Sequence, residues 1–263
     1  MHLVHRRIAQ SRWPRWRKQI ARALTGLPAR SVAEIGLLRY RWLAQTNGLP
    51  TTPLESFGQS ELAIAPPLLD DVCMPPYIGT TDHDDYQPLM RMAHSMQPRR
   101  ILELGTAHGN TVANLCRLLP NAHVLTVNAP AEMQTGRIIT YHLSIEEIGR
   151  VYRRYGYADR VQQVYANTLD LQLSDYLDGP VIDLAIVDAC HDRDYVLNDF
   201  GKVQPFIRPG GLLLLHDTAP LWHAFVSESY KACLLLRQRG FDIRHVPGTW
   251  WALWSNGPLT PGV

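Results

Sequence analysis

Short hydrophobic runs recur along the second half of the chain, separated by longer stretches with helical periodicity. The runs lie at residues 101–104, 123–127, 161–165, 182–187 and 212–215. A strand that is buried on both faces of a parallel sheet appears as such a continuous apolar run. Because these runs alternate with helical stretches, the pattern predicts a doubly wound α/β fold with helices on both faces of a parallel sheet.

Near the C-terminus the pattern changes from helical stretches to two short strand-like segments. Residues 241–246 alternate between apolar and polar, Pro247-Gly248 follows, and residues 250–254 are aromatic and apolar. Two strands joined by a Pro-Gly turn predict an antiparallel edge on the parallel sheet. The expected architecture is a Rossmann-like, mostly parallel, seven-stranded sheet with an antiparallel C-terminal edge.

The part before this sheet divides into two segments of different composition. Residues 1–47 combine arginines with spaced isoleucine, leucine and tryptophan, a spacing that predicts a helical N-terminal appendage with one apolar face. Residues 48–81 contain six prolines and predict an extended linker across the domain surface. The main α/β domain is expected over residues 82–263, with a first amphipathic helix around residues 86–96.

Charge is distributed unevenly along the chain. The formal net charge is only +2, yet eight basic residues precede the first acidic one, Glu34, and the remainder holds 18 basic against 24 acidic residues. Because the main domain is net negative and has no continuous phosphate-binding track, we expect no nucleic-acid partner. The basic, tryptophan-bearing N-terminus leaves weak peripheral membrane contact open, and also an organelle presequence.

Composition narrows the setting further. Hydrophobic residues make up 46% of the chain, which is enough for a sizeable core and excludes global disorder. The four cysteines are scattered without a C-x-x-C pair, which argues against a disulfide framework and a zinc knuckle and favours a reducing, cytoplasmic setting. Since no apolar run reaches the length of a membrane span, we expect no transmembrane segment.

A glycine-containing turn follows the first predicted strand and has the sequence Glu103-Leu-Gly105-Thr-Ala-His-Gly109. The two glycines permit a tight turn and close approach of the backbone to a ligand. The helix expected over residues 110–119 would point its N-terminal amides at that ligand. The G-x-x-x-G spacing differs from the G-x-G-x-x-G of hydride-transferring domains, so a nicotinamide-dependent reductase is the weaker alternative.

Together with residues 183–188 and 206–217, this turn resembles the class I S-adenosylmethionine-dependent methyltransferases over about residues 80–254. The resemblance implies that S-adenosylmethionine is the cofactor. Asn128 stands where the family usually has an acidic ribose ligand, so it can hydrogen-bond a hydroxyl without contributing charge. The residues that the resemblance assigns to cofactor binding are Glu103, Gly105, Thr106, Ala107, Gly109, Asn128, Asn167, Thr168 and Asp188.

Residues 187–195 and the pair His216-Asp217 are similar to small-molecule O-methyltransferases that modify sugars of antibiotics such as macrocin and novobiocin. In that group, acidic residues at the ends of the fourth and fifth strands bind a divalent cation. The resemblance therefore implies magnesium or manganese at Asp188 and Asp217, with His216 in place of the first of two adjacent acidic residues. The alternative is that Asp188 fixes the cofactor or a loop and Asp217 caps a helix.

Methyl transfer to a hydroxyl needs a positioned oxygen and a group that takes its proton. His191 is our first candidate for that base, His216 is the second, and Asp188 completes the candidate catalytic set. In the similar enzymes an acidic residue near this loop can serve as the base, but Cys190 stands in the corresponding place here. A surface or hydrogen-bonding role for His191 stays open, because a histidine in a loop more often has that role.

Two function hypotheses follow from these residues. The first is an S-adenosylmethionine-dependent O-methyltransferase that acts on a small-molecule hydroxyl, with or without a metal. The second is a catalytically inactive, methyltransferase-like binding module, because a fold does not by itself imply turnover. The sequence leaves open the acceptor and whether the protein forms a homo-oligomer.

Overall fold

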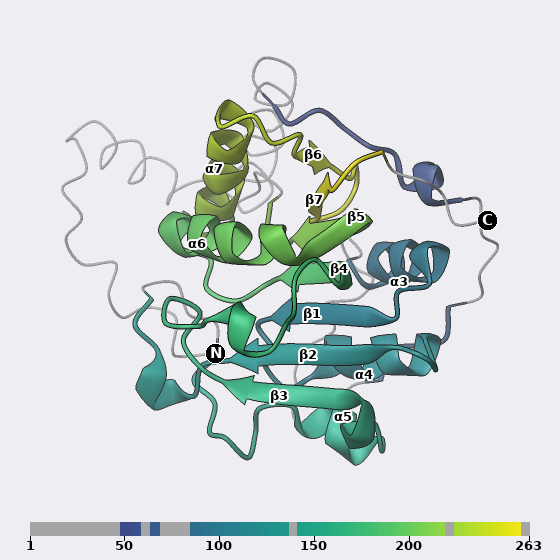
Figure 1. Cartoon of the computed structure of the whole chain (residues 1–263), viewed down its shortest axis with the longest axis vertical. Coiled ribbons are helices and arrows are strands. Elements are labelled where there is room, and N and C mark those ends of the chain that lie inside the picture. Colours follow the sequence, from purple (N-terminus) through teal and green to yellow (C-terminus); the bar gives the residue numbers. More distant parts are fainter. Residues whose placement is uncertain (1–47, 59–63, 69–84, 137–140, 219–223, 259–263) are drawn as a thin grey trace, which may run out of the picture. The chain divides into compact units, whose positions relative to one another are not determined.

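The computed structural model describes residues 48–58, 64–68, 85–136, 141–218 and 224–258 (Figure 1). The predicted N-terminal helical segment, residues 1–47, lies outside the described residues. Among the helices that are described, none is long and apolar enough to cross a membrane.

One seven-stranded sheet organises the described part of the chain, in the order β3-β2-β1-β4-β5-β7-β6. Strands β1 to β5 pair in parallel, and β7 is antiparallel to both β5 and β6. The predicted mostly parallel sheet with an antiparallel C-terminal edge is therefore confirmed. The strands are β1 (Arg100–Leu104), β2 (His123–Asn128), β3 (Val161–Tyr165), β4 (Ile182–Val187), β5 (Ile207–Leu215), β6 (Arg244–His245) and β7 (Ala252–Ser255).

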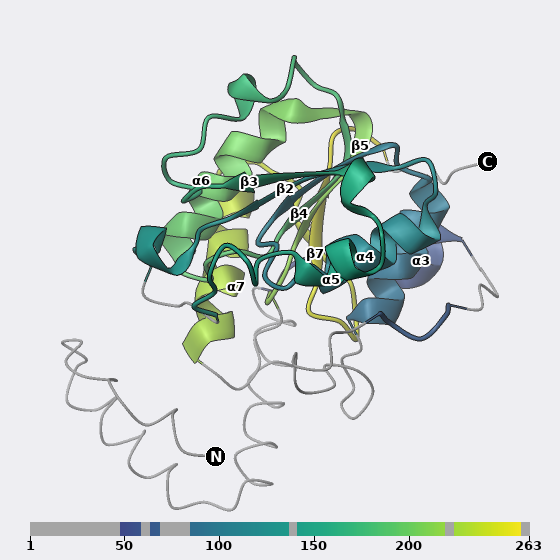
Figure 2. The same cartoon turned by 90° about the horizontal axis from the view of Figure 1, so that it is seen from below.

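Helices cover both faces of this sheet, as the alternating pattern predicts. Figure 2 shows α6 and α7 on one face and α3, α4 and α5 on the other. The helices are α3 (Tyr86–Met96), α4 (Asn110–Leu118), α5 (Arg150–Arg154), α6 (Arg193–Val203) and α7 (Ala224–Gln238). Short 3-10 turns lie at Leu54–Phe57, Ala131–Met133, Ala158–Arg160, Leu173–Asp175 and Gln204–Phe206.

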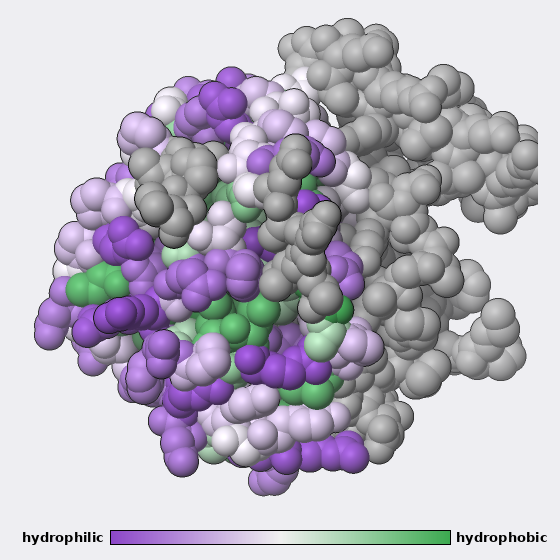
Figure 3. All heavy atoms as spheres, turned by 90° about the vertical axis from the view of Figure 1, so that its right-hand side faces the viewer, coloured by the Kyte–Doolittle hydropathy of each residue, from purple (hydrophilic) through white to green (hydrophobic). Residues whose placement is uncertain are grey.

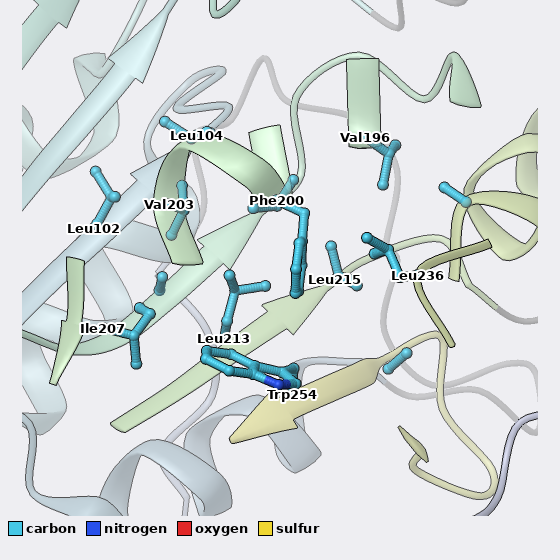
Figure 4. Packing of buried hydrophobic residues seen from close by; sticks show 14 of the residues in the cluster. Leu102, Leu104, Val196, Phe200, Val203, Ile207, Leu213, Leu215, Leu236 and Trp254 are labelled. Carbon is cyan, nitrogen blue, oxygen red and sulfur yellow. The ribbon is translucent and has the colours of Figure 1, made fainter. Parts of the chain in front are cut away.

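Successive strand residues point to opposite faces, so the sheet separates two buried clusters. Under α6 and α7, Phe200 packs against Trp254 in a T-shaped contact with 5.8 Å between the ring centres, among the leucines that Figure 4 labels. Under α3 and α4, Met90 and Met92 are buried beside Ile101 of β1. Met92 therefore fills the core, whereas Met90 also lines the cavity at the carboxyl ends of the strands.

Part of the segment predicted as a proline-rich linker packs along the β6 edge. The amide of Thr52 donates to the carbonyl of His245 at 2.9 Å, and the amide of His245 donates to the carbonyl of Pro50 at 2.8 Å. Leu49 and Phe57 are buried. This pairing covers a strand edge that would otherwise expose unpaired backbone groups. The rest of the predicted linker, residues 59–63 and 69–81, lies outside the described residues.

The side at which β1, β2 and β3 begin is shown in Figure 3, where hydrophilic residues surround a small hydrophobic area. At this end the carboxylate of Asp183 accepts the backbone amides of Arg99 and Arg100 at 2.8 and 2.7 Å and is paired with Arg208. The polar groups at these strand starts therefore stabilise the sheet, and the larger cavity lies at the opposite end.

Candidate functional site

A cavity of about 420 Å³ lies at the carboxyl ends of the parallel strands. It spans β1 and β4, the neighbours at which the strand order reverses, where open α/β sheets bind their ligands. Its size lies within the range of small-molecule pockets, about 300–1,000 Å³. Most of the predicted site residues line it: Gly105, Thr106, Ala107, Asn128, Asn167, Thr168, Asp188, His191, His216 and Asp217.

The glycine turn after β1 is fixed by close packing against β4. Gly105 has φ +108°, and a Cβ atom there would collide with the carbonyl oxygen of Asp188. Gly109 has φ +85° and is the N-cap of α4, and its Cβ would lie 2.8 Å from the Tyr152 ring. Only glycine meets both demands without strain. Gly109 does not line the cavity, so its role is to let the turn adopt this backbone conformation against Tyr152.

Glu103 also lies behind the turn and does not line the cavity; its exposed fraction is 2%. The hydroxyl of Thr126 donates to its carboxylate at 2.6 Å, and the Thr106 hydroxyl lies 2.7 Å from that of Thr126. Burial raises the pKa of Glu103 to about 8; the charge of Asp188 adds to this rise, and the bond from Thr126 opposes it. Glu103 therefore carries a proton at neutral pH and supports the loop through its threonine neighbours.

Asn128, at the end of β2, holds the same turn. Its Oδ1 accepts the amide of Ala107 at 2.9 Å, and its Nδ2 donates to the carbonyl of Ala129 at 2.9 Å. Ala107 has φ +44°, a conformation that costs energy for a residue with a side chain, so this bond stabilises a strained position. The side-chain amide of Asn128 therefore stabilises the glycine turn, and the residue also lines the cavity.

Asn167, after β3, anchors the segment that follows β2. Its Nδ2 donates to the carbonyl of Met133 at 3.0 Å and to the Thr135 hydroxyl at 2.9 Å, and its Oδ1 accepts the amide of Leu169 at 3.0 Å. The hydroxyl of Thr135 is 2.5 Å from that of Tyr195. These hydrogen bonds therefore fix residues 131–136 at the cavity wall.

This wall contains a polar residue that the sequence did not single out. Gln134 lines the cavity, and its Nε2 donates to the carbonyls of Ala129 and Tyr141 at 3.1 and 3.0 Å. Its buried Oε1, like the Oδ1 of Asn110 at the start of α4, has no hydrogen-bond partner among the described residues. Both residues belong to the cavity lining, and buried polar atoms in native proteins are normally hydrogen-bonded. Gln134 lies in an aperiodic loop, so no sequence pattern marked it.

A group of acidic and imidazole side chains forms the other wall. The Nδ1 of His216 lies 2.9 Å from Asp188 and 3.3 Å from Asp217, and its Nε2 lies 3.1 Å from Asp85. Asp85 immediately precedes α3 and also accepts the backbone amide of Trp250 at 2.8 Å. The sequence indicated Asp188 and Asp217, whereas Asp85 joins them only through the fold.

The opposite charges in this group favour one another's ionised forms. Burial disfavours the charged form of His216, but the negative charges of Asp188 and Asp217 outweigh it and raise the pKa of His216 well above its ordinary value. Burial likewise raises the pKa of Asp188, but the charge and hydrogen bond of His216 and the charge of His191 reverse that effect and lower it. His216 is therefore a cation and Asp188 an anion at neutral pH.

His191 is buried beside a carboxylate of the same group. Its Nδ1 lies 3.2 Å from the carboxylate of Asp217. A carboxylate on one ring nitrogen fixes the orientation of a histidine, as in the pairs that act as general bases. The structure thus brings together His191, Asp217, His216 and Asp188, with Cys190 beside them in the lining.

The donor set does not fit the divalent cation that the sequence resemblance implies. Both ring nitrogens of His216 face carboxylates, so neither offers a lone pair to a metal. Within the described ranges, no group of three or more His, Cys, Asp or Glu side chains is arranged to hold a metal ion.

Comparisons with known proteins agree with this fold. The O-methyltransferase TomG of Streptomyces achromogenes, involved in tomaymycin synthesis and solved with S-adenosylmethionine, is 16% identical, with a TM-score of 0.50 over 88% of this chain and 100% of that one. A methyltransferase of Podospora anserina with bound S-adenosylhomocysteine is also 16% identical, with a TM-score of 0.50 over 94% of this chain and 98% of that one. At this identity the likeness concerns the fold.

Sequence comparison identifies the domain. Residues 102–218 match the model of a methyltransferase domain family. An uncharacterised protein of Sinorhizobium fredii, y4gI, is 27% identical over 166 residues, which cover 63% of this chain and 18% of that protein. The chain thus spans less than a fifth of the length of this relative. Residues 102–218 are therefore similar to a methyltransferase domain, and the seven-stranded sheet has the fold of these two solved methyltransferases.

Proposed function

We propose that this chain transfers the methyl group of S-adenosylmethionine to a hydroxyl of a small-molecule acceptor. The observation that carries the proposal is one cavity that joins the glycine turn after β1 to the His191–Asp217 pair. The turn is the part of this fold that binds the cofactor, and the pair is suited to removing a proton. O-methyl transfer requires both at one site.

The cavity wall offers complementary groups for the cofactor. Gln134 and Asn110 supply polar side chains to this lining. The first amides of α4 would face its carboxylate, which a helix N-terminus favours. The Asn128 side chain holds the turn in position. When bound, the cofactor supplies an electrophilic methyl group on a sulfonium.

The acceptor is expected beside the acid–imidazole wall, where Tyr86, Trp250 and Trp251 also line the cavity. His191, oriented by Asp217, would take the proton of the acceptor hydroxyl as that oxygen bonds to the methyl carbon. S-adenosylmethionine would supply the methyl carbon, and the electron pair of the carbon–sulfur bond would remain on sulfur. His216 is held between carboxylates, so it contributes positive charge and position rather than proton removal.

The test is methyl transfer from labelled S-adenosylmethionine to a panel of sugar, phenol and polyketide-type hydroxyls. His191→Gln is expected to keep cofactor affinity and to lower kcat by at least about 100-fold, the range of general-base loss. The control is His142→Gln, because His142 is exposed and does not line the cavity. Cofactor binding with no transfer to any hydroxyl would favour a non-catalytic binding module and contradict the proposal.

A further inference from the structure

The carboxylates of the acid–imidazole wall, which consists of Asp85, Asp188, His216 and Asp217, all lie close to the His216 ring. Asp188 and Asp85 lie at hydrogen-bond distance on opposite sides of the His216 ring, at 2.9 and 3.1 Å, and Asp217 lies 3.3 Å from the same ring. Both ring nitrogens of His216 are therefore occupied by carboxylates, and the ring fills the space between the carboxylate groups.

The ring is also held in place by its surroundings. Its centre lies 4.3 Å from that of Trp251, and only 18% of the His216 side chain is exposed. Rotating it away would break two charge-assisted hydrogen bonds, which are about twice as strong as neutral ones.

We infer that methyl transfer at this site needs no divalent cation, because the His216 ring binds the carboxylates that a cation would otherwise bind. This inference rests on the proposed methyl transfer and concerns how its site is charged. In the enzymes that the sequence resembles, the position of His216 is acidic, and the pair of acidic residues binds the metal. Here the chain places its own His216 side chain between these carboxylates.

The inference makes a prediction that does not depend on knowing the acceptor. Mn²⁺ is titrated into the full-length protein, and the free ion is followed by electron paramagnetic resonance. The wild type is expected to leave the signal of free Mn²⁺ unchanged up to about 1 mM. His216→Asp, which places two adjacent carboxylates after β5, is expected to bind one Mn²⁺ per chain at least about tenfold more tightly than the wild type.

The control variant is His123→Asp, which adds a carboxylate at an exposed position at the start of β2. It is expected to behave as the wild type. Stoichiometric Mn²⁺ binding by the wild type below about 1 mM would overturn the inference, as would a His216→Asp protein that binds S-adenosylmethionine normally but no Mn²⁺. If that variant fails to fold, the wild-type titration alone decides. Failure of the proposed function would show separately, as absence of S-adenosylmethionine binding in calorimetry.

Discussion

Replacing Glu103 by glutamine is expected to remove a pH-dependent loss of stability. The carboxyl group is buried and accepts the Thr126 hydroxyl at 2.6 Å. Glutamine has nearly the same shape, and its carbonyl oxygen can accept the same bond. The substitution therefore changes the titration of this position while keeping its packing.

The magnitude follows from the pKa of Glu103, which burial raises from 4.5 to about 8. Between these values the folded chain binds a proton that the unfolded chain releases. The free energy of unfolding therefore falls as pH rises through this window, by about 1.4 kcal/mol per pH unit. The loss is on the order of 3 kcal/mol at pH 7 and on the order of 5 kcal/mol above pH 8.

Urea unfolding followed by tryptophan fluorescence, at several pH values between 5 and 8.5, measures this difference. Glu103→Gln is expected to gain stability relative to the wild type as pH rises, because other titrating groups cancel in the comparison. The control is Glu132→Gln at an exposed position, which is expected to follow the wild type. A constant difference between Glu103→Gln and the wild type across this range would refute the reasoning, since it would mean that Glu103 is ionised in the folded chain.

Two further predictions concern groups near the cavity. Asp199 is fully buried in α6, and burial raises its pKa from 3.8 to about 6. Asp199→Asn is therefore expected to gain roughly 2 kcal/mol over the wild type between pH 4 and 6.5 in the same unfolding assay, and a gain that is independent of pH would count against this reasoning. Asn167→Ala removes two hydrogen bonds that hold residues 131–136 at the cavity wall. The variant is therefore expected to bind S-adenosylmethionine about tenfold more weakly, and proteolysis of residues 131–136 is expected to be faster. The control is Asp170→Ala at an exposed position nearby, and equal affinities for the two variants would contradict this role.

The strands and the glycine turn could be predicted because their causes are local. Apolar runs mark β1 to β5, and the collision between a Cβ at Gly105 and the Asp188 carbonyl explains why that turn needs glycine. The Pro247-Gly248 turn likewise predicted the antiparallel pair, although β6 forms only over Arg244–His245. Each of these features depends on residues that are close in sequence or on strand order, which periodicity reveals.

The hydrogen bonds and ion pairs of the site could not be predicted in the same way. His216 is held by Asp85, which lies 131 residues earlier and whose neighbours gave no pattern of chemistry. Asn128 and Asn167 line the cavity as expected, but most of their hydrogen bonds stabilise loops, which sequence alone does not distinguish from ligand binding. Gln134 was missed because a loop residue acquires its role only from what surrounds it.

Calorimetric titration of the full-length protein with S-adenosylmethionine and with S-adenosylhomocysteine tests the central claim most directly. The wild type is expected to bind both with dissociation constants at or below about 0.1 mM, and Gly105→Ala to bind neither measurably, because its side chain would collide with the Asp188 backbone. Gly179→Ala is the control, since Gly179 also has positive φ, +73°, but has nothing within 4 Å of its Cβ position. Absence of binding by the wild type at about 1 mM, or binding that Gly105→Ala retains, would contradict cofactor binding at the Gly105 turn.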